Sequence, residues 1–229
     1  MICPNLSNPQ IRQEFEELKS VLGEDMAYLI WDRNGGYGLD KTRDGKPSKL
    51  FNDLLGLTDR KGAIEIKAKT LSNSFKQWFG ESKVVDENGE PLVVYHGTDN
   101  TFSEFKTGIN DSIYVTARKD YADIYGKSMP LFLKINNILD VRNLFNDENF
   151  KEFLRNNPGN GFNIEKLVKN NQTVISLTNN SFLVDYYKSK GFDGLKGSLE
   201  YSIFEPNQIK SIFNTGIFNR YSDNIYDND

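Results

Sequence analysis

Hydrophobic residues recur at helical spacing through the first 80 residues of the chain. Within residues 9–22 one face of a helix would carry the large apolar side chains, which are Ile11, Phe15, Leu18 and Leu22. Asn8 is suited to cap the start of this helix, and Gly23 is suited to end it. The same spacing predicts helices over residues 48–57 and 60–79. We therefore expect residues 1–80 to form a helical subdomain, which serves either as a packing platform or as a partner-binding part.

The pattern changes to short β-type segments after residue 82. Two β-rich runs, residues 83–86 and 91–95, flank an Asn-Gly pair at positions 88 and 89, which is the strongest short-range signal of a hairpin. Further segments have the composition of strands: 112–116, 130–141 and 200–205. The segments between them have helical spacing: 118–126, 147–156, 163–170 and 179–190. This order predicts an α+β domain over residues 81–220, followed by a polar tail over 221–229 that frays.

Composition narrows the classes of function. Hydrophobic residues make up 38% of the 229 residues, which is enough for a packed core. The net charge of −4 and the lack of a Lys/Arg block disfavour a strong electrostatic grip on nucleic acid. Cys3 and His96 are the only cysteine and histidine, which excludes an internal disulfide, a Cys-rich zinc site and a multi-histidine metal site. Without a membrane-length apolar run or a signal peptide, the sequence predicts a cytoplasmic protein with no membrane contact.

Three segments carry candidate chemistry. His96 follows the predicted strand 91–95 directly, so it is expected at a strand end, where a sheet commonly opens onto a site. Tyr114 lies in the next β-type run, and Tyr125 follows in a helical turn, so the two rings could close on a flat heteroaromatic ring. Glu200 begins an alternating run near the end of the chain. Each residue taken alone is ordinary, and only their combination suggests a site.

These segments, in this order, resemble the H-Y-E class of ADP-ribosyltransferases, which includes the poly(ADP-ribose) polymerases and diphtheria toxin. The family's His-Gly-Ser/Thr motif matches residues 96–98, its tyrosine run matches 113–115, and its glutamate run matches 200–204. The sequence around these motifs resembles the ADP-ribosyltransferase domains of bacteriophage and mobile-element polyvalent proteins. The resemblance implies a split antiparallel β-sandwich core of the ADP-ribosyltransferase type, NAD+ as co-substrate and no metal.

The resemblance also implies a role for each motif residue. His96 would hydrogen-bond the adenosine ribose of NAD+, and the backbone of Gly97 would bind the nicotinamide carboxamide. Tyr114 and Tyr125 would sandwich the nicotinamide ring. Glu200 would bind the 2′-hydroxyl of the nicotinamide ribose and hold the acceptor. Breaking the bond to nicotinamide leaves an oxocarbenium-like ribose, so one carboxylate beside a stacking slot suits this chemistry.

Two positions depart from the pattern or compete with it. The family often has a small hydroxyl residue three positions before the second stacking tyrosine, where this chain has Ala122. Thr98 or Tyr121 could replace that anchor for the carboxamide. Glu205 lies in the same predicted strand as Glu200 and is the alternative carboxylate, although Glu200 occupies the family position. The motifs of the R-S-E class are absent from the sequence.

The expected function is mono-ADP-ribosyl transfer from NAD+ to a macromolecule of a bacterial host, in the host cytoplasm if a phage encodes the protein. A protein acceptor is favoured over nucleic acid. An NAD+ glycohydrolase would use the same pocket with water as acceptor, and a non-catalytic nucleotide- or partner-binding virion protein is the alternative of a different class. Transfer of an RNA 2′-phosphate would need a basic site, which the acidic balance disfavours. The acceptor, the oligomeric state and the choice between mono- and poly-ADP-ribosylation stay open.

Overall fold

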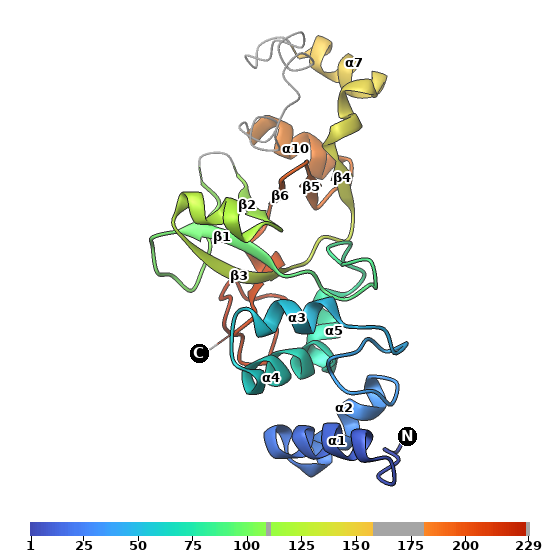
Figure 1. The fold of residues 1–229 in the computed structure, drawn as a ribbon. Helices are drawn as coiled ribbons and strands as arrows, with labels where there is room; N and C mark the ends of the chain where they lie inside the picture. The colour runs from blue at the N-terminus through green and yellow to red at the C-terminus, as the bar shows by residue number, and fades with distance from the viewer. Residues whose placement is uncertain (109–110, 158–180, 228–229) are drawn as a thin grey trace.

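A computed structural model describes residues 1–108, 111–157 and 181–227 (Figure 1). The N-terminal part is helical, as the spacing predicted, with helices α1 (Pro9–Leu22), α2 (Glu24–Arg33), α3 (Lys49–Leu55), α4 (Arg60–Thr70) and α5 (Asn73–Phe79). The Asn8 side chain accepts hydrogen bonds from the backbone of Gln10 and Ile11, so the predicted cap of α1 is confirmed. The prediction of one helix over 60–79 is wrong, because the Ser72 hydroxyl accepts from the Phe75 backbone at 3.1 Å and starts a separate helix.

The rest of the described chain forms one seven-stranded sheet with helices around it, which confirms the α+β class. Its strands are β1 (Val94–Thr98), β2 (Ile113–Thr116), β3 (Lys127–Leu133), β4 (Ile138–Asp140), β5 (Gly194–Lys196), β6 (Glu200–Ile203) and β7 (Ile209–Ser211). The order across the sheet is β4-β5-β6-β2-β1-β3-β7. Neighbouring strands are antiparallel except β4 and β5, which are parallel. The three remaining α-helices of the described residues are α6 (Lys119–Ala122), α7 (Glu148–Asn156) and α10 (Ser181–Ser189).

The connections between strands refine several predicted boundaries. The Asn-Gly turn is present, with Gly89 at φ 78° and a single antiparallel bridge that closes the hairpin between Val85 and Pro91. The predicted strands on its two sides are wrong in extent, because residues 83–86 form no strand and β1 begins only at Val94. The predicted strand 130–141 is two strands, because the Asp193 carboxylate accepts from the backbone of Asn136 and Asn137 and breaks the run. The strands β5 and β7 were not predicted. The predicted helix 163–170 lies outside the described residues.

The N-terminal helices pack directly on the sheet. One hydrophobic cluster joins Phe15, Trp31 and Trp78 to residues of the sheet, such as Phe132. The Trp78 indole N–H also donates to the backbone carbonyl of Asn207 at 3.0 Å. Residues 1–80 and 81–220 therefore share a hydrophobic core, and their division into two domains stays a prediction. No helix in the described part of the chain is long and apolar enough to cross a membrane.

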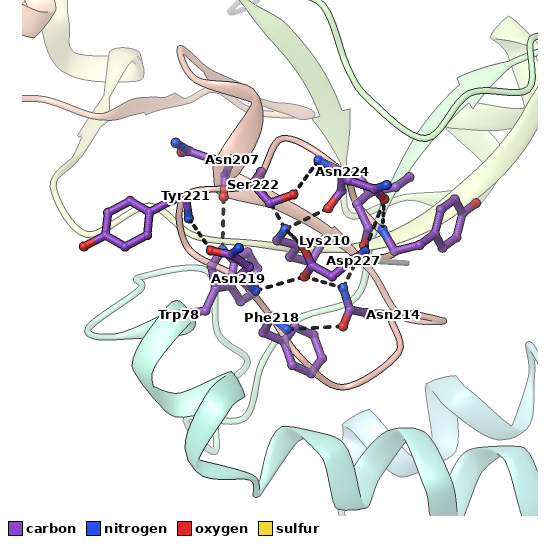
Figure 2. Close-up of polar contacts among 12 residues, drawn as sticks. Trp78, Asn207, Lys210, Asn214, Phe218, Asn219, Tyr221, Ser222, Asn224 and Asp227 are labelled. Atoms are coloured by element: carbon purple, nitrogen blue, oxygen red, sulfur yellow. Dashed lines mark hydrogen bonds and ion pairs between the residues drawn. The ribbon is translucent and has the colours of Figure 1, made fainter. Parts of the chain in front are cut away.

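The C-terminal segment is fastened to the sheet (Figure 2). Lys210 on β7 is 0% exposed, and its ammonium donates to the Asp227 carboxylate at 2.7 Å and to the backbone carbonyls of Ser222 and Asn224. Ile225 is also 0% exposed. The expectation that residues after 220 fray is wrong for 221–227, because one buried ion pair and one apolar side chain hold a segment whose composition is polar.

Candidate active site

Strands β1 and β2 diverge midway along β1, where His96 lies. The expectation that His96 lies at a strand end is wrong, because β1 continues to Thr98 through its pairing with β3. The two strands pair at Tyr95 and Thr116, whereas β1 pairs with β3 along its whole length. Continued pairing would place Gly97 opposite Tyr114. Instead, the His96 side chain reaches the Tyr114 backbone carbonyl, with Nδ1 and the carbonyl oxygen 2.8 Å apart. The imidazole thus forms a hydrogen bond with a carbonyl that would otherwise accept from a backbone N–H of the neighbouring strand. The sheet opens beside Gly97 as a result.

The surroundings of His96 fix its protonation and its orientation. Burial lowers the pKa of the imidazole, and its hydrogen bond to the Tyr114 carbonyl opposes that shift. Because a carbonyl only accepts, the neutral ring must carry its proton on Nδ1 and leave Nε2 as an acceptor. Phe105 packs edge-on against the imidazole, with ring centroids 5.0 Å apart. His96 therefore presents a fixed, neutral Nε2 to whatever lies beside β1.

The short helix α6 and the turn after it cover the end of β1 closely. A Cβ atom on Gly97 would lie 1.9 Å from the Ala122 carbonyl oxygen, so no other residue fits at position 97 without a shift of the backbone. Gly126 has φ 126°, and a Cβ atom there would meet the backbone of Thr98 at 2.6 Å. These two glycines allow residues 119–125 to lie directly over β1, which brings the side chains of Tyr121 and Tyr125 to the opening of the sheet.

Glu200 comes from the other side of the opening. It is the first residue of β6, it pairs with Thr116 of β2, and it is 5% exposed. Its Oε1 accepts from the Tyr121 hydroxyl at 3.4 Å, which is long for such a bond, and its Oε2 is buried without a partner among the described residues. Burial raises the pKa of Glu200, and the Tyr121 hydrogen bond partly offsets this rise. A buried carboxylate oxygen without a partner is costly, and a ligand hydroxyl would satisfy it.

Tyr121 and Tyr125 form a pair beside this carboxylate. Their rings meet edge to face with centroids 5.7 Å apart, and their hydroxyl oxygens are 3.3 Å apart. The pKa of Tyr121 is raised, mainly by its hydrogen bond with Tyr125. Its hydroxyl therefore stays protonated and can donate a hydrogen bond to Glu200. Tyr125 is 56% exposed, which leaves much of its ring open to a ligand.

These groups enclose a cavity of about 190 Å³. Its lining consists of Tyr95, His96, Gly97, Tyr114, Val115, Thr116, Tyr121, Ala122, Tyr125 and Glu200. The cavity is below the range of pockets that hold a whole drug-sized molecule, but its aromatic walls and single carboxylate suit one flat ring and an attached hydroxyl group. A second groove of about 450 Å³ adjoins it, and both include His96 and Tyr114 in their lining.

A sequence model of the family described as ADP-ribosyltransferase in polyvalent proteins matches residues 86–218. This span is more than half of the chain and includes the whole lining of the cavity. The chain belongs to this family. No curated protein and no solved structure gave a match. ADP-ribosyltransferases use NAD+ as co-substrate, and the resemblance that the motifs suggested is confirmed.

The fold of this ADP-ribosyltransferase domain brings together most of the residues expected at its site. His96, Gly97, Tyr114, Tyr121, Tyr125 and Glu200 line one cavity. Thr98 does not line it and instead borders the adjoining groove. Glu205, the alternative carboxylate, lies elsewhere in an ion pair with Lys188 at 2.8 Å. The roles expected of these residues stay predictions.

Thr116, Tyr95 and Val115 are cavity residues that were not singled out from the sequence. Thr116 had a signal, because it follows Tyr114 by two positions on a strand and so shares its face. Its hydroxyl donates to the Leu199 carbonyl at 2.6 Å, next to Glu200. Ala122 is part of the lining, so the position where the family often has a hydroxyl group carries only a methyl group in this chain. Among the described residues no group of His, Cys, Asp and Glu could hold a metal ion.

Proposed function

We propose that this protein is a mono-ADP-ribosyltransferase that transfers ADP-ribose from NAD+ to a macromolecular acceptor and releases nicotinamide. The observation that carries the proposal is the partnerless, buried Oε2 of Glu200 in a cavity walled by tyrosines. A carboxylate in this position, which forms no ion pair with any described residue, is placed to stabilise positive charge that develops on a ligand. Membership of the ADP-ribosyltransferase family supports NAD+ as that ligand.

The tyrosines would hold the nicotinamide ring. Tyr114 and Tyr125 belong to β2 and to the turn after α6, which are the two sides of the cavity. A cationic pyridinium ring is attracted to aromatic faces, so this slot favours oxidised nicotinamide. The backbone of Gly97, which a side chain would block, would bind the carboxamide. Because Ala122 has no hydroxyl group, the Gly97 backbone would bind the carboxamide without a further hydrogen bond from position 122.

Glu200 would act on the ribose. NAD+ supplies a ribose whose bond to nicotinamide breaks with the bonding electron pair leaving on the nicotinamide nitrogen. The Glu200 carboxylate would accept a hydrogen bond from the 2′-hydroxyl and would stabilise the positive charge left on the sugar. The Tyr121 hydroxyl would keep Glu200 ionised, because a hydrogen bond donated to a carboxylate favours its charged form.

The remainder of NAD+ would extend past His96 into the adjoining groove. The cavity is too small for the whole dinucleotide, whereas the groove of about 450 Å³ continues from the same His96 and Tyr114. The neutral His96 Nε2 would accept a hydrogen bond from a ribose hydroxyl there. Phe102 and Phe105 line this groove and give it an apolar wall.

A protein acceptor fits the cavity mouth better than nucleic acid. Tyr125, which lines the cavity, is 56% exposed. Leu199, which precedes the lining residue Glu200 in sequence, is 36% exposed. Exposed apolar side chains beside a reactive site are suited to another protein surface. The net charge of −4 also opposes long-range attraction of nucleic acid.

Replacing Tyr121 with phenylalanine is expected to move the acid limb of kcat/KM for NAD+ to higher pH. Glu200 acts as a carboxylate, so activity falls as pH falls through its raised pKa. Losing the hydrogen bond that opposes this rise would raise the pKa of Glu200 further. Tyr221→Phe, at an exposed position, is the matched control. An acid limb that stays in place, or moves to lower pH, would remove Tyr121 from this role.

Labelled NAD+ distinguishes transfer from hydrolysis. The purified protein is incubated with NAD+ labelled in its adenylate part, with and without a bacterial lysate. We expect the label to appear on a lysate protein, and nuclease treatment to leave the band intact. ADP-ribose formed at the same rate with and without lysate would instead identify an NAD+ glycohydrolase. A label removed by nuclease would overturn the choice of a protein acceptor.

A further inference from the structure

A second, larger groove of about 870 Å³ lies between the N-terminal helices and the hairpin that precedes β1. It shares no lining residue with the tyrosine cavity. The loop after α2, the helices α4 and α5, and the hairpin at residues 85–91 all contribute to it. In Figure 1 the loops that follow α2 and α5 lie to the right of the helices, whereas β1 and β2 lie to the left. The groove is therefore a separate surface of the molecule.

Three cationic side chains in this lining have no partner in the part of the chain that the structure describes. Arg43, Lys76 and Lys83 are exposed, and none of them has an ion pair or a side-chain hydrogen bond within the described residues. Arg43 and Lys76 are close enough to repel each other: burial lowers the pKa of Lys76 first, and the charges of Arg33 and Arg43 lower it further. In a protein with net charge −4, an uncompensated cationic cluster is costly unless something else neutralises it.

The acidic residues of the lining do not neutralise this cluster. Asp44 is held by Lys46 at 3.0 Å and by the Thr42 hydroxyl. Glu90 accepts from the buried Lys67 and from the Ser48 hydroxyl. Glu81 is the one carboxylate of the lining without an ion pair in the described part of the chain. Three free cations thus face one free carboxylate.

The lining of the groove also includes a buried ammonium group. Lys67 is 1% exposed, and its ammonium donates to the Ser48 hydroxyl at 2.7 Å and to Glu90. An ammonium has three N–H donors, so one remains without a partner among the described residues. Burial lowers the pKa of Lys67, and Glu90 opposes that shift. Apolar side chains complete the lining beside this donor: Leu71, Phe75, Phe79 and Val85.

We propose that this groove, defined by Arg43, Lys67, Lys76 and Lys83, binds a phosphate-bearing small molecule of nucleotide size. Its volume is in the range of small-molecule sites, and the guanidinium and ammonium donors match phosphate oxygens in charge and geometry. The apolar part of the lining suits a ring attached to the phosphates. This site is distinct from the tyrosine cavity, so it does not depend on the proposed transfer of ADP-ribose.

Isothermal titration calorimetry at an ionic strength of about 0.15 M, where charges more than about 8 Å apart are largely screened, tests the groove with two probes, inorganic tripolyphosphate and ATP. The full chain is compared with the double variant R43E/K76E and with a control, K61E/R155E, which changes the net charge equally at exposed positions outside the groove. We expect both probes to bind the wild type. We expect R43E/K76E to weaken binding about tenfold or more and the control to weaken it less than about twofold, because only close charges are felt strongly in salt.

Several results would overturn the proposal. Wild-type protein that binds neither probe would end it, as would an equal loss of affinity in both double variants. Loss of tripolyphosphate binding in His96→Ala would place the anion at the NAD+ cavity instead. ATP that binds no more tightly than tripolyphosphate would remove the role of the apolar wall. In support, the measured pKa of Lys76 should rise when the ligand binds, and nicotinamide release by R43E/K76E should equal that of the wild type.

Discussion

Glutamine in place of Glu200 is expected to lower the rate of nicotinamide release from NAD+ by about 10²–10³-fold, the range observed when one preorganised electrostatic group is lost from an active site. The amide keeps the shape of the side chain and one acceptor oxygen. It loses the negative charge that would stabilise the ribose cation, so the loss should fall on kcat with a small change in KM. Single-turnover release of nicotinamide measures the chemical step without product dissociation.

The fold should tolerate this substitution. Glu200 is 5% exposed, and its Oε2 has no partner in the described residues, so a neutral amide avoids the desolvation of a buried charge. The melting temperature of Glu200→Gln should therefore equal or exceed that of the wild type. Glu205→Gln is the matched control, because Glu205 lies in a surface ion pair and should retain full activity. Equal rates for wild type and Glu200→Gln would remove Glu200 from the chemistry.

Methionine in place of Lys210 is expected to lower the free energy of unfolding by about 3–5 kcal/mol, the cost of removing one partner from a buried ion pair. Lys210 and Asp227 are both buried, and the lysine also donates to two backbone carbonyls of the C-terminal segment. The variant would leave Asp227 buried with its charge uncompensated by a cation, and the segment around Ile225 should detach first. Urea denaturation followed by tryptophan fluorescence gives the free energy, since Trp78 stacks on Phe218 with ring centroids 5.9 Å apart and the next residue, Asn219, donates its backbone N–H to Asp227 (Figure 2).

A surface pair provides the comparison for Lys210. Lys188 and Glu205 are 2.8 Å apart, but their side chains are 39% and 58% exposed. Lys188→Met should cost at most about 1 kcal/mol, because solvent screens exposed ion pairs. Similar losses in the two methionine variants would mean that the buried network does not hold the C-terminal segment.

The elements with local signals were predictable from the sequence. The cap at Asn8 and the turn at Asn88 and Gly89 depend on residues close in the chain, and both are present. The helix boundary at Ser72 was missed, because the helical spacing of hydrophobic residues continues through it. The Ser72 cap, which starts a new helix there, leaves that spacing unchanged. The three-residue strands β5 and β7 were missed for another reason: each is defined by its partners across the sheet, at Ile203 and at Leu131, and not by its own pattern.

The candidate site was predictable as a set of residues but not as an arrangement. The motifs placed His96, Tyr114 and Glu200 on strands, and the strand order then brings them to one opening. The hydrogen bond between Tyr121 and Glu200 joins residues 79 positions apart and depends on how closely α6 lies over Gly97. Thr98 borders the adjoining groove and not the cavity, which its motif did not indicate. No local pattern encodes such long-range contacts.

Nicotinamide release from NAD+ by the purified wild-type chain is the most direct test of the proposed activity. We expect release that saturates with NAD+ and increases when a bacterial lysate supplies the acceptor. Circular dichroism on the same sample confirms that the chain is folded. A folded wild-type protein that releases no nicotinamide, with or without lysate, would contradict the assignment of the tyrosine cavity as an NAD+-consuming active site.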